Sequence, residues 1–187
     1  VMLHRAGFNS FIDGQPASLA MELMAEGGDN TDVLGEVAAA AEHLASGSTA
    51  GPVPPGGRDT VTLSFPSDQL TDVRLSLGTM LVHTNDAFSG TNAFDVSNMD
   101  VGQTIRLTGP TWDASTEAND ELGVNIPGPD INGEGINAAR DDLFDRVHFF
   151  QGTVTSASVE SGLPTSDLEE RHRIDNSSTR ISITRTQ

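Results

Sequence analysis

The chain lacks cysteine, tyrosine and lysine altogether, and it has a single tryptophan among its 187 residues. Without cysteine it can form no disulfide framework, no zinc–cysteine site and no thiol nucleophile. Aromatic residues make up 5% of the chain, which leaves few of the stacking platforms that glycoside hydrolases use to hold sugar. These absences count against several classes of enzyme.

Positive charge is scarce as well. Ten arginines stand against 27 acidic residues, which gives a net charge of −17 at pH 7. A polyanion or an anionic membrane would meet a surface of its own sign, without a basic patch that could release counterions. We therefore expect no nucleic-acid partner. The acidity is also compatible with a high-salt habitat, in which carboxylates hold water and salt screens their repulsion.

Long apolar runs are missing too. No stretch approaches the roughly 18 apolar residues of a transmembrane helix, and the first residues show no charged segment followed by an apolar run. We expect no transmembrane segment and no signal peptide within these residues. The length predicts one domain with one core, while nine prolines and 19 glycines predict much turn and loop.

Helical periodicity is confined to the first quarter of the chain. Between residues 16 and 27, apolar side chains recur at spacings of four, starting at Leu19. A second apolar stripe runs from Val33 to Leu44, after a Gly-Gly-Asp-Asn sequence that can cap a helix. The proline-containing residues 46–57 then indicate a loop.

Strand periodicity dominates the rest. Val61, Leu63 and Phe65 alternate with hydroxyl side chains, which is typical of a half-buried strand. The candidate strands are residues 1–4, 61–65, 73–78, 104–107, 147–150 and 180–184. We predict a mainly β fold, an antiparallel β-sandwich of about eight strands with one or two helices inserted between the opening strand and Val61.

Three acidic segments stand apart from the general negative charge. They are residues 84–86, 112–120 and 130–135, and all of them lie in expected loops. Hard cations such as calcium take six to eight oxygen ligands from carboxylates, carbonyls and water. Loops at one end of a sandwich can supply such a set. The alternative is that these acids are ordinary solvated loop residues.

Several sequence segments also occur in a characteristic order. They are Gln15-Pro16-Ala17-Ser18 followed by Ala25-Glu26-Gly27-Gly28-Asp29-Asn30, then Met80-Leu81-Val82-His83-Thr84-Asn85-Asp86-Ala87-Phe88, then Trp112-Asp113-Ala114-Ser115-Thr116-Glu117-Ala118-Asn119-Asp120-Glu121, and last Leu163-Pro164-Thr165-Ser166 with His172-Arg173-Ile174-Asp175-Asn176. Together they resemble the spondin N-terminal domain in its short microbial form. The resemblance covers nearly the whole chain, so residues 1–187 would form a single spondin-type domain.

The resemblance implies a calcium-binding antiparallel β-sandwich of the kind found in extracellular matrix and cell-adhesion proteins. The metal ligands of the animal members match Asp86, Asp113 and Glu117 here, with Glu117 in place of an aspartate. A longer side chain can still reach the ion, although it can also bind in a bidentate mode. The resemblance thus implies one Ca²⁺ site built from these three residues.

The chain departs from the family in two respects. It lacks the cysteines of the animal members, and the strand that usually opens the domain is not present ahead of Val1. Either the chain begins late, or a strand from a neighbouring chain completes the sheet, because an open edge offers unpaired backbone groups. Self-association is therefore one expectation.

A second metal set is conceivable in the loop that follows. Asp130, Asn132 and Glu134, with Asp141 at the twelfth position, resemble an EF-hand or dockerin loop. The apolar residue Ile136 falls one place early for that motif. An ordinary loop rich in glycine and aspartate remains the alternative.

Catalytic readings have less support. Asp113 and Glu117 could act as the acid and the nucleophile of a glycosidase, and His172 could act as a general base beside Asp175. The sequence motifs of the nucleophile elbow, the phosphate-binding loop and zinc enzymes are absent, however. In the acidic C-terminal loop, His172 and Arg173 are better explained as groups that pin the last strand. We expect that the protein is not an enzyme.

The function that we predict is that of a secreted or cell-surface calcium-binding module for adhesion or for interaction with a protein or glycan. The alternative is a structural subunit of an extracellular fibre or assembly completed by strand exchange.

Overall fold

The computed structural model describes residues 1–128, 133, 136, 139–150, 152, 167–168, 174 and 177–187. Its helices and strands are β1 (Met2–Arg5), α1 (Leu19–Gly27), α2 (Thr31–Ala39), β2 (His43–Ser46), the 3-10 helix η1 (Ser67–Gln69), β3 (Val73–Met80), β4 (Ala87–Asp95), β5 (Thr104–Gly109), β6 (Thr111–Asp113), β7 (His148–Phe149) and β8 (Thr179–Thr184). One antiparallel sheet has the order β2-β1-β3-β4-β6-β7, and a second consists of β5 and β8. The predicted mainly β sandwich with inserted helices is confirmed for this part of the chain.

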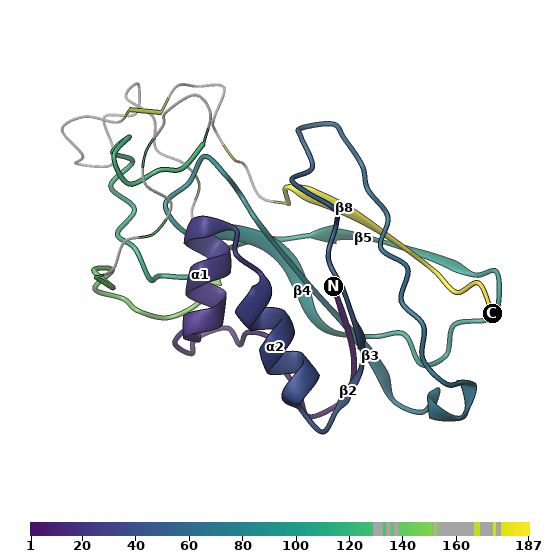
Figure 1. The fold of residues 1–187 in the computed structure, drawn as a ribbon. Coiled ribbons are helices and arrows are strands. Elements are labelled where there is room, and N and C mark those ends of the chain that lie inside the picture. Colours follow the sequence, from purple (N-terminus) through teal and green to yellow (C-terminus); the bar gives the residue numbers. More distant parts are fainter. Residues whose placement is uncertain are drawn as a thin grey trace.

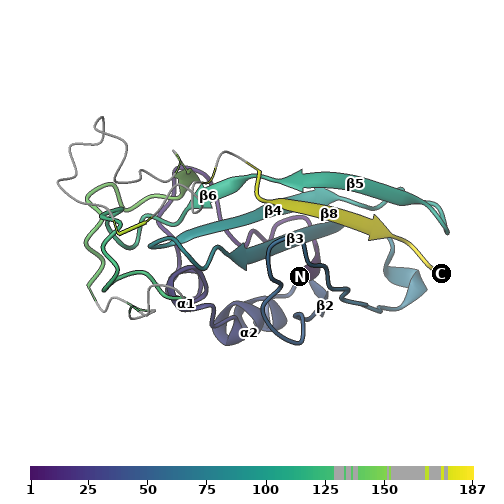
Figure 2. The same cartoon turned by 90° about the horizontal axis from the view of Figure 1, so that it is seen from above.

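The two sheets are linked by one run of chain. β5 and β6 are separated only by Pro110, and Figure 2 shows them as a nearly continuous ribbon. The Ser89 hydroxyl of β4 donates to the carbonyl of Gly109 at 2.9 Å and lies 2.8 Å from the hydroxyl of Thr179 in β8. A Cβ on Gly109 would lie 2.2 Å from that Thr179 oxygen, in the paired strand of the same sheet, and 2.9 Å from the Ser89 hydroxyl oxygen of the larger sheet, so this position leaves no room for a side chain.

The two helices cover one face of the larger sheet. α1 contacts β3 and β4, whereas α2 contacts β1 and β2 (Figure 1). The hydroxyl of Ser18 accepts the Met21 amide at 3.2 Å and caps α1, and Gly28 ends it at a φ of 72°. Leu19, which the spacing placed on the apolar stripe, is 63% exposed. The buried apolar core between helices and sheet consists of Met2, Phe11, Ala17, Ala20, Met21, Met24, Ala25, Val33, Val37, Phe88, Ala114 and Val147.

The end of the second helix and the strand at residues 61–65 were predicted wrongly. The second helix ends at Ala39, short of the expected Leu44, and residues 43–46 form β2, since pairing with β1 outweighs helical periodicity there. Residues 61–65 keep their alternating exposure but pair with no strand among the described residues. β4 was not predicted, because its Ala-Phe-Ser-Gly-Thr-Asn sequence has no clear alternation.

None of the helices in the part of the chain that the structure describes is long and apolar enough to cross a membrane.

Candidate functional site

The turn between β3 and β4 places Asp86 at the end of the larger sheet. Thr84 shapes this turn, because its hydroxyl donates to the Leu81 carbonyl at 2.6 Å and accepts the Ala87 amide at 3.1 Å. Asp86 is completely buried in this position. The turn lies at the end of the molecule where teal and green loops gather beside α1, on the left of Figure 1.

The segment after β6 brings polar atoms to Asp86. β6 pairs with the first residues of β4, so Asp113 leaves the sheet beside the turn. Asp113 Oδ1 accepts the Ser115 amide at 2.7 Å, and Ser115 has a left-handed φ of 54° that reverses the chain. This reversal directs the amides of Thr116 and Glu117 at Asp86.

The two carboxylate oxygens of Asp86 have different surroundings. Oδ2 accepts the amides of Thr116 at 2.6 Å and Glu117 at 3.1 Å. Oδ1 is buried and has no hydrogen-bond partner among the described residues. Burial, and then repulsion from Asp113, raise the pKa of Asp86 well above its usual value, although the hydrogen bonds to Oδ2 act in the opposite direction. Asp86 is therefore a buried acid with one unused oxygen.

Glu117 is in a similar position. It is 1% exposed, and its Oε1 is buried without a hydrogen-bond partner in the described part of the chain. Burial, and then repulsion from Glu26, raise the pKa of Glu117 to about 8, while a hydrogen bond with Asn85 opposes the shift. No salt bridge from a described arginine or histidine reaches Asp86 or Glu117.

Helix α1 contributes an acid that was not among the predicted ligands. Glu26 is fully buried, and its Oε1 accepts the Thr116 hydroxyl at 2.6 Å. The same hydroxyl lies 3.3 Å from Asp86 Oδ2, so Thr116 links the two carboxylates. The helical pattern places Glu26 at the border of the apolar face that Met21 and Ala25 form, but it does not show which residues lie opposite that face.

Asp113 differs from the other two predicted ligands, because both of its oxygens are engaged. Oδ1 accepts the amide of Ser115 at 2.7 Å and lies 3.2 Å from the Ser115 hydroxyl, and Oδ2 accepts the side-chain amide of Asn119 at 2.6 Å. His148 Nε2 lies 3.9 Å from Oδ2. Asp113 thus shapes the loop that carries Glu117 and repels Asp86.

Ser115, His148 and Asp113 contain the residue types of a hydrolytic triad. The Ser115 hydroxyl lies 3.0 Å from His148 Nδ1 and 2.8 Å from the Arg146 carbonyl, to which it donates. Ser115 is completely buried, however, and its hydroxyl is engaged with these internal partners. The arrangement therefore offers no accessible nucleophile.

The chemistry of the unused oxygens suits a hard cation. Among the described residues, no three histidine, cysteine, aspartate or glutamate side chains are grouped so that they could hold a metal ion. Asp86 Oδ1 and Glu117 Oε1 therefore supply only part of a ligand shell. Calcium commonly completes its shell of six to eight oxygens with backbone carbonyls, amide oxygens and water.

Most of the possible second metal set lies outside the described residues: Asp130, Asn132 and Glu134, as well as His172, Arg173 and Asp175. Asp141, the fourth residue of the set, is described and lies beside the first cluster. Its Oδ1 accepts the Ala118 amide at 2.8 Å, its own amide donates to the Thr116 carbonyl at 3.2 Å, and it contributes to the raised pKa of Glu117.

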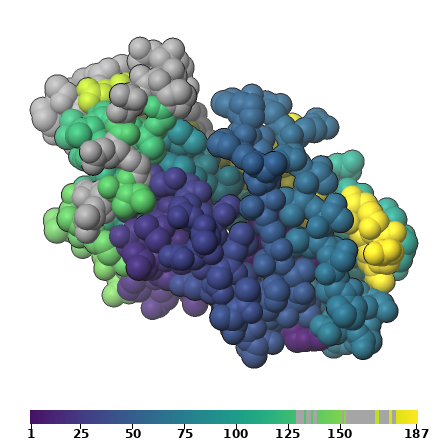
Figure 3. Space-filling model, in the orientation of Figure 1, coloured from purple at the N-terminus to yellow at the C-terminus, as the bar shows by residue number. Residues whose placement is uncertain are grey.

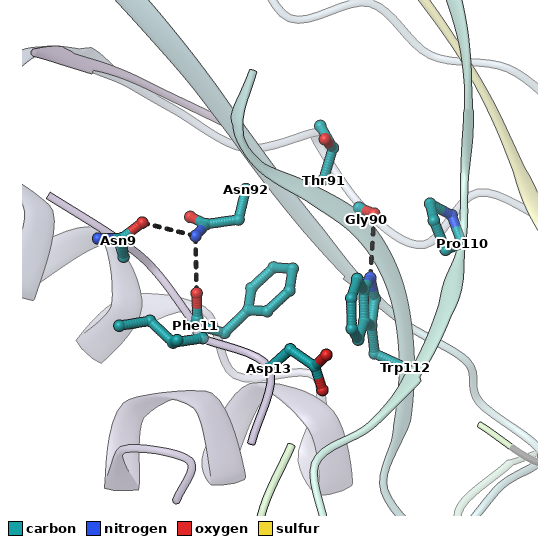
Figure 4. Close-up of a pocket in the computed structure, with 9 residues that line it drawn as sticks. Asn9, Phe11, Asp13, Gly90, Thr91, Asn92, Pro110 and Trp112 are labelled. Carbon is teal, nitrogen blue, oxygen red and sulfur yellow. Dashed lines mark hydrogen bonds between the residues drawn. The ribbon is translucent and has the colours of Figure 1, made fainter. Parts of the chain in front are cut away.

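A pocket of about 380 Å³ is lined by Phe11, Asn92 and Trp112, among other residues. The side-chain amide of Asn92 donates to Asn9 Oδ1 at 2.8 Å and to the Phe11 carbonyl at 2.7 Å, and the Trp112 indole donates to the Gly90 carbonyl at 3.3 Å (Figure 4). These donors on its wall are already used within the protein. The pocket is therefore a weaker site than the acidic cluster.

No family model matches this chain, and no curated protein matches it.

Proposed function

We propose that this protein is a calcium-binding module of the spondin type, secreted or exposed at a cell surface, which binds a protein or glycan partner without catalysis. One observation carries the proposal. Asp86 and Glu117 each bury a carboxylate oxygen that has no partner among the described residues. The resemblance of the sequence segments to spondin domains supports the same reading.

The energetics favour a bound cation. An ionised carboxylate in a low-dielectric interior is costly unless an opposite charge or hydrogen bonds compensate it. Here the charges nearest to Asp86 and Glu117 are those of other acids, which raise both pKa values further. A divalent cation would neutralise this repulsion and let both groups ionise at neutral pH.

Calcium would connect parts of the chain that are distant in sequence. Asp86 Oδ1 and Glu117 Oε1 would bind the ion directly, while Asp113 positions the loop through Ser115 and Asn119. The connected parts are the β3–β4 turn and the segment after β6, with the end of α1 joined to them through Thr116. The bound ion would fix these loops as one surface, and such a surface is what a partner would recognise.

Calorimetric titration with calcium tests the proposal. The wild-type protein should bind calcium, and Asp86→Asn should weaken binding by at least about tenfold, because one charged oxygen ligand is lost. Asp100→Asn is the matched control, since Asp100 is exposed and its side chain has no hydrogen bond or salt bridge among the described residues. Equal affinities for wild type and Asp86→Asn would contradict the proposal.

A structural subunit completed by strand exchange is the alternative. The observation that favours it is the segment 61–65, whose backbone makes no hydrogen bond with another backbone group of the described residues. Electron microscopy of the purified protein separates the two readings. Filaments would support the structural subunit, and discrete particles would support the binding module.

A further inference from the structure

Residues 57–66 cross the surface without a turn, a bend or a helix. Val61, Leu63 and Phe65 are half-buried, whereas Thr62 and Ser64 are exposed. The half-buried side chains rest on the protein itself. A Cβ on Gly47 would lie 3.3 Å from Leu63 Cδ2 and 3.5 Å from Val61 Cγ1. The segment therefore has the two-faced character of a strand in a sheet.

The backbone of this segment is unpaired. Between residues 61 and 65, no amide or carbonyl forms a hydrogen bond with another group of the described residues. In the space-filling view, the blue chain that leads from β2 to β3 lies at the surface, where another strand could reach it (Figure 3). An exposed extended segment with unpaired backbone groups is a template for β-strand addition.

A second copy of the same segment complements it in the antiparallel direction. If Leu63 of one copy lies opposite Leu63 of the other, Val61 lies opposite Phe65 and Thr62 opposite Ser64. The apolar pairs then share one face and the hydroxyl pairs share the other, which is the pattern that stabilises antiparallel pairs. Pro66 has no amide proton and would end the pairing at that side.

Charge also favours a second copy at this place. Residues 60–67 contain no charged side chain, although the chain as a whole carries −17. Arg58 and Asp59 precede the segment, and Asp68 follows it in η1; all three are exposed. In the antiparallel register Arg58 of one copy is opposite Asp68 of the other, once at each end of the pair, and there it offsets the acids Asp59 and Asp68. The paired residues themselves bring no like charges together.

We propose that two copies of this protein associate through residues 60–65, paired as antiparallel strands about a two-fold axis. Such an interface uses the same surface on both copies and closes on itself, so it yields a dimer and no filament. The pairing involves none of the residues of the acidic cluster and is independent of calcium binding.

Sedimentation equilibrium of the full chain in about 0.15 M salt tests the proposal. Over concentrations from about 1 to 100 μM, the mass should rise toward twice the 19.7 kDa of one chain, with and without calcium. A mass that stays at one chain over the whole range would overturn the proposal, and so would growth beyond two chains.

Charge variants test where the copies meet. Arg58→Asp places like charges together at both symmetric ends and should weaken the dimer by about tenfold, whereas the double variant Arg58→Asp/Asp68→Arg should restore it. Arg106→Asp is the control, because Arg106 is exposed on β5 and carries the same change of charge. An equal effect of Arg58→Asp and Arg106→Asp would overturn the assignment.

The register has its own test. Thr62→Asp/Ser64→Asp should dissociate the dimer, because the two positions face each other and four carboxylates would meet. Thr62→Lys/Ser64→Asp puts opposite charges at the same positions and should keep the dimer. Both side chains are exposed in one chain, so the melting temperature of the dissociated chain should change little. Dissociation by both variants to the same degree would contradict the register.

Discussion

Glu117 and Asp86 are acids whose pKa values are raised by burial and by other acids. In the unfolded chain Glu117 ionises near its ordinary value of 4.5, and in the fold near about 8. Between these values the folded protein binds more protons than the unfolded chain, so stability falls as pH rises through that window. The two residues therefore link the pH dependence of stability to the proposed metal site.

We predict that without calcium the free energy of unfolding falls by about 3–5 kcal/mol between pH 5 and pH 8, at about 1.4 kcal/mol for each pKa unit. Saturating calcium should remove most of this fall, because it stabilises the ionised carboxylates. Urea unfolding at several pH values, in EDTA and in calcium, measures both effects. Glu117→Gln should flatten the curve in EDTA. A calcium-free stability that rises over this range would contradict the raised pKa values.

The sequence could point to Asp86 and Glu117 but not to their surroundings. With 27 acids in the chain, composition alone selects none, and the resemblance of segments was the source of the residues. Glu26 could not be predicted as a neighbour, since its position depends on how α1 packs against the sheet. Both Asp113 oxygens accept hydrogen bonds because the chain turns at Ser115 in a left-handed conformation, and the sequence does not predict that conformation.

At the scale of elements, the β3–β4 pair depends on a close backbone approach. Gly90 of β4 lies opposite Gly78 of β3, and a Cβ on Gly90 would lie 2.0 Å from the Leu77 carbonyl oxygen. An alanine at this position would push the two strands apart. Because this pair carries the turn with Asp86, its geometry also matters for the site.

We predict that Gly90→Ala lowers the free energy of unfolding by about 1–3 kcal/mol or more, as overpacking does elsewhere. Gly35→Ala is the control, because a Cβ on Gly35 meets nothing within 4 Å and the residue lies inside α2. That variant should gain about 0.5–1 kcal/mol from helix propensity. Thermal unfolding of both variants measures these changes. A Gly90→Ala variant as stable as the wild type would mean that the two strands are not this close.

Elements with a regular apolar period were predictable, and those set by neighbours were not. The first helix, β3, β5 and β8 form where their apolar patterns predict them, although Leu19 of the first helix is exposed. β2 instead forms because β1 offers backbone partners to a segment with a helical pattern. Residues 61–65 show the reverse case, in which a strand pattern is present and no described strand lies beside it to pair. In both segments, the presence or absence of a hydrogen-bonding partner distant in sequence determines whether a strand forms.

At the scale of the whole molecule, the charge of −17 opposes folding through self-repulsion. We predict that the calcium-free melting temperature rises on the order of 5 °C between about 0.05 and 1 M NaCl, because salt shortens the range of the repulsion. Scanning calorimetry measures this change, and KCl should act like NaCl if screening is the cause. A melting temperature that falls with salt would show that attractive surface ion pairs dominate instead.

The central claim is that the buried oxygens of Asp86 and Glu117 exist to bind a cation. A crystal structure of the protein grown with saturating calcium tests it most directly. We predict an ion about 2.3–2.6 Å from both Asp86 Oδ1 and Glu117 Oε1, with carbonyl or water oxygens completing its shell. Well-ordered loops in which these two oxygens point apart, with no ion between them, would contradict the account.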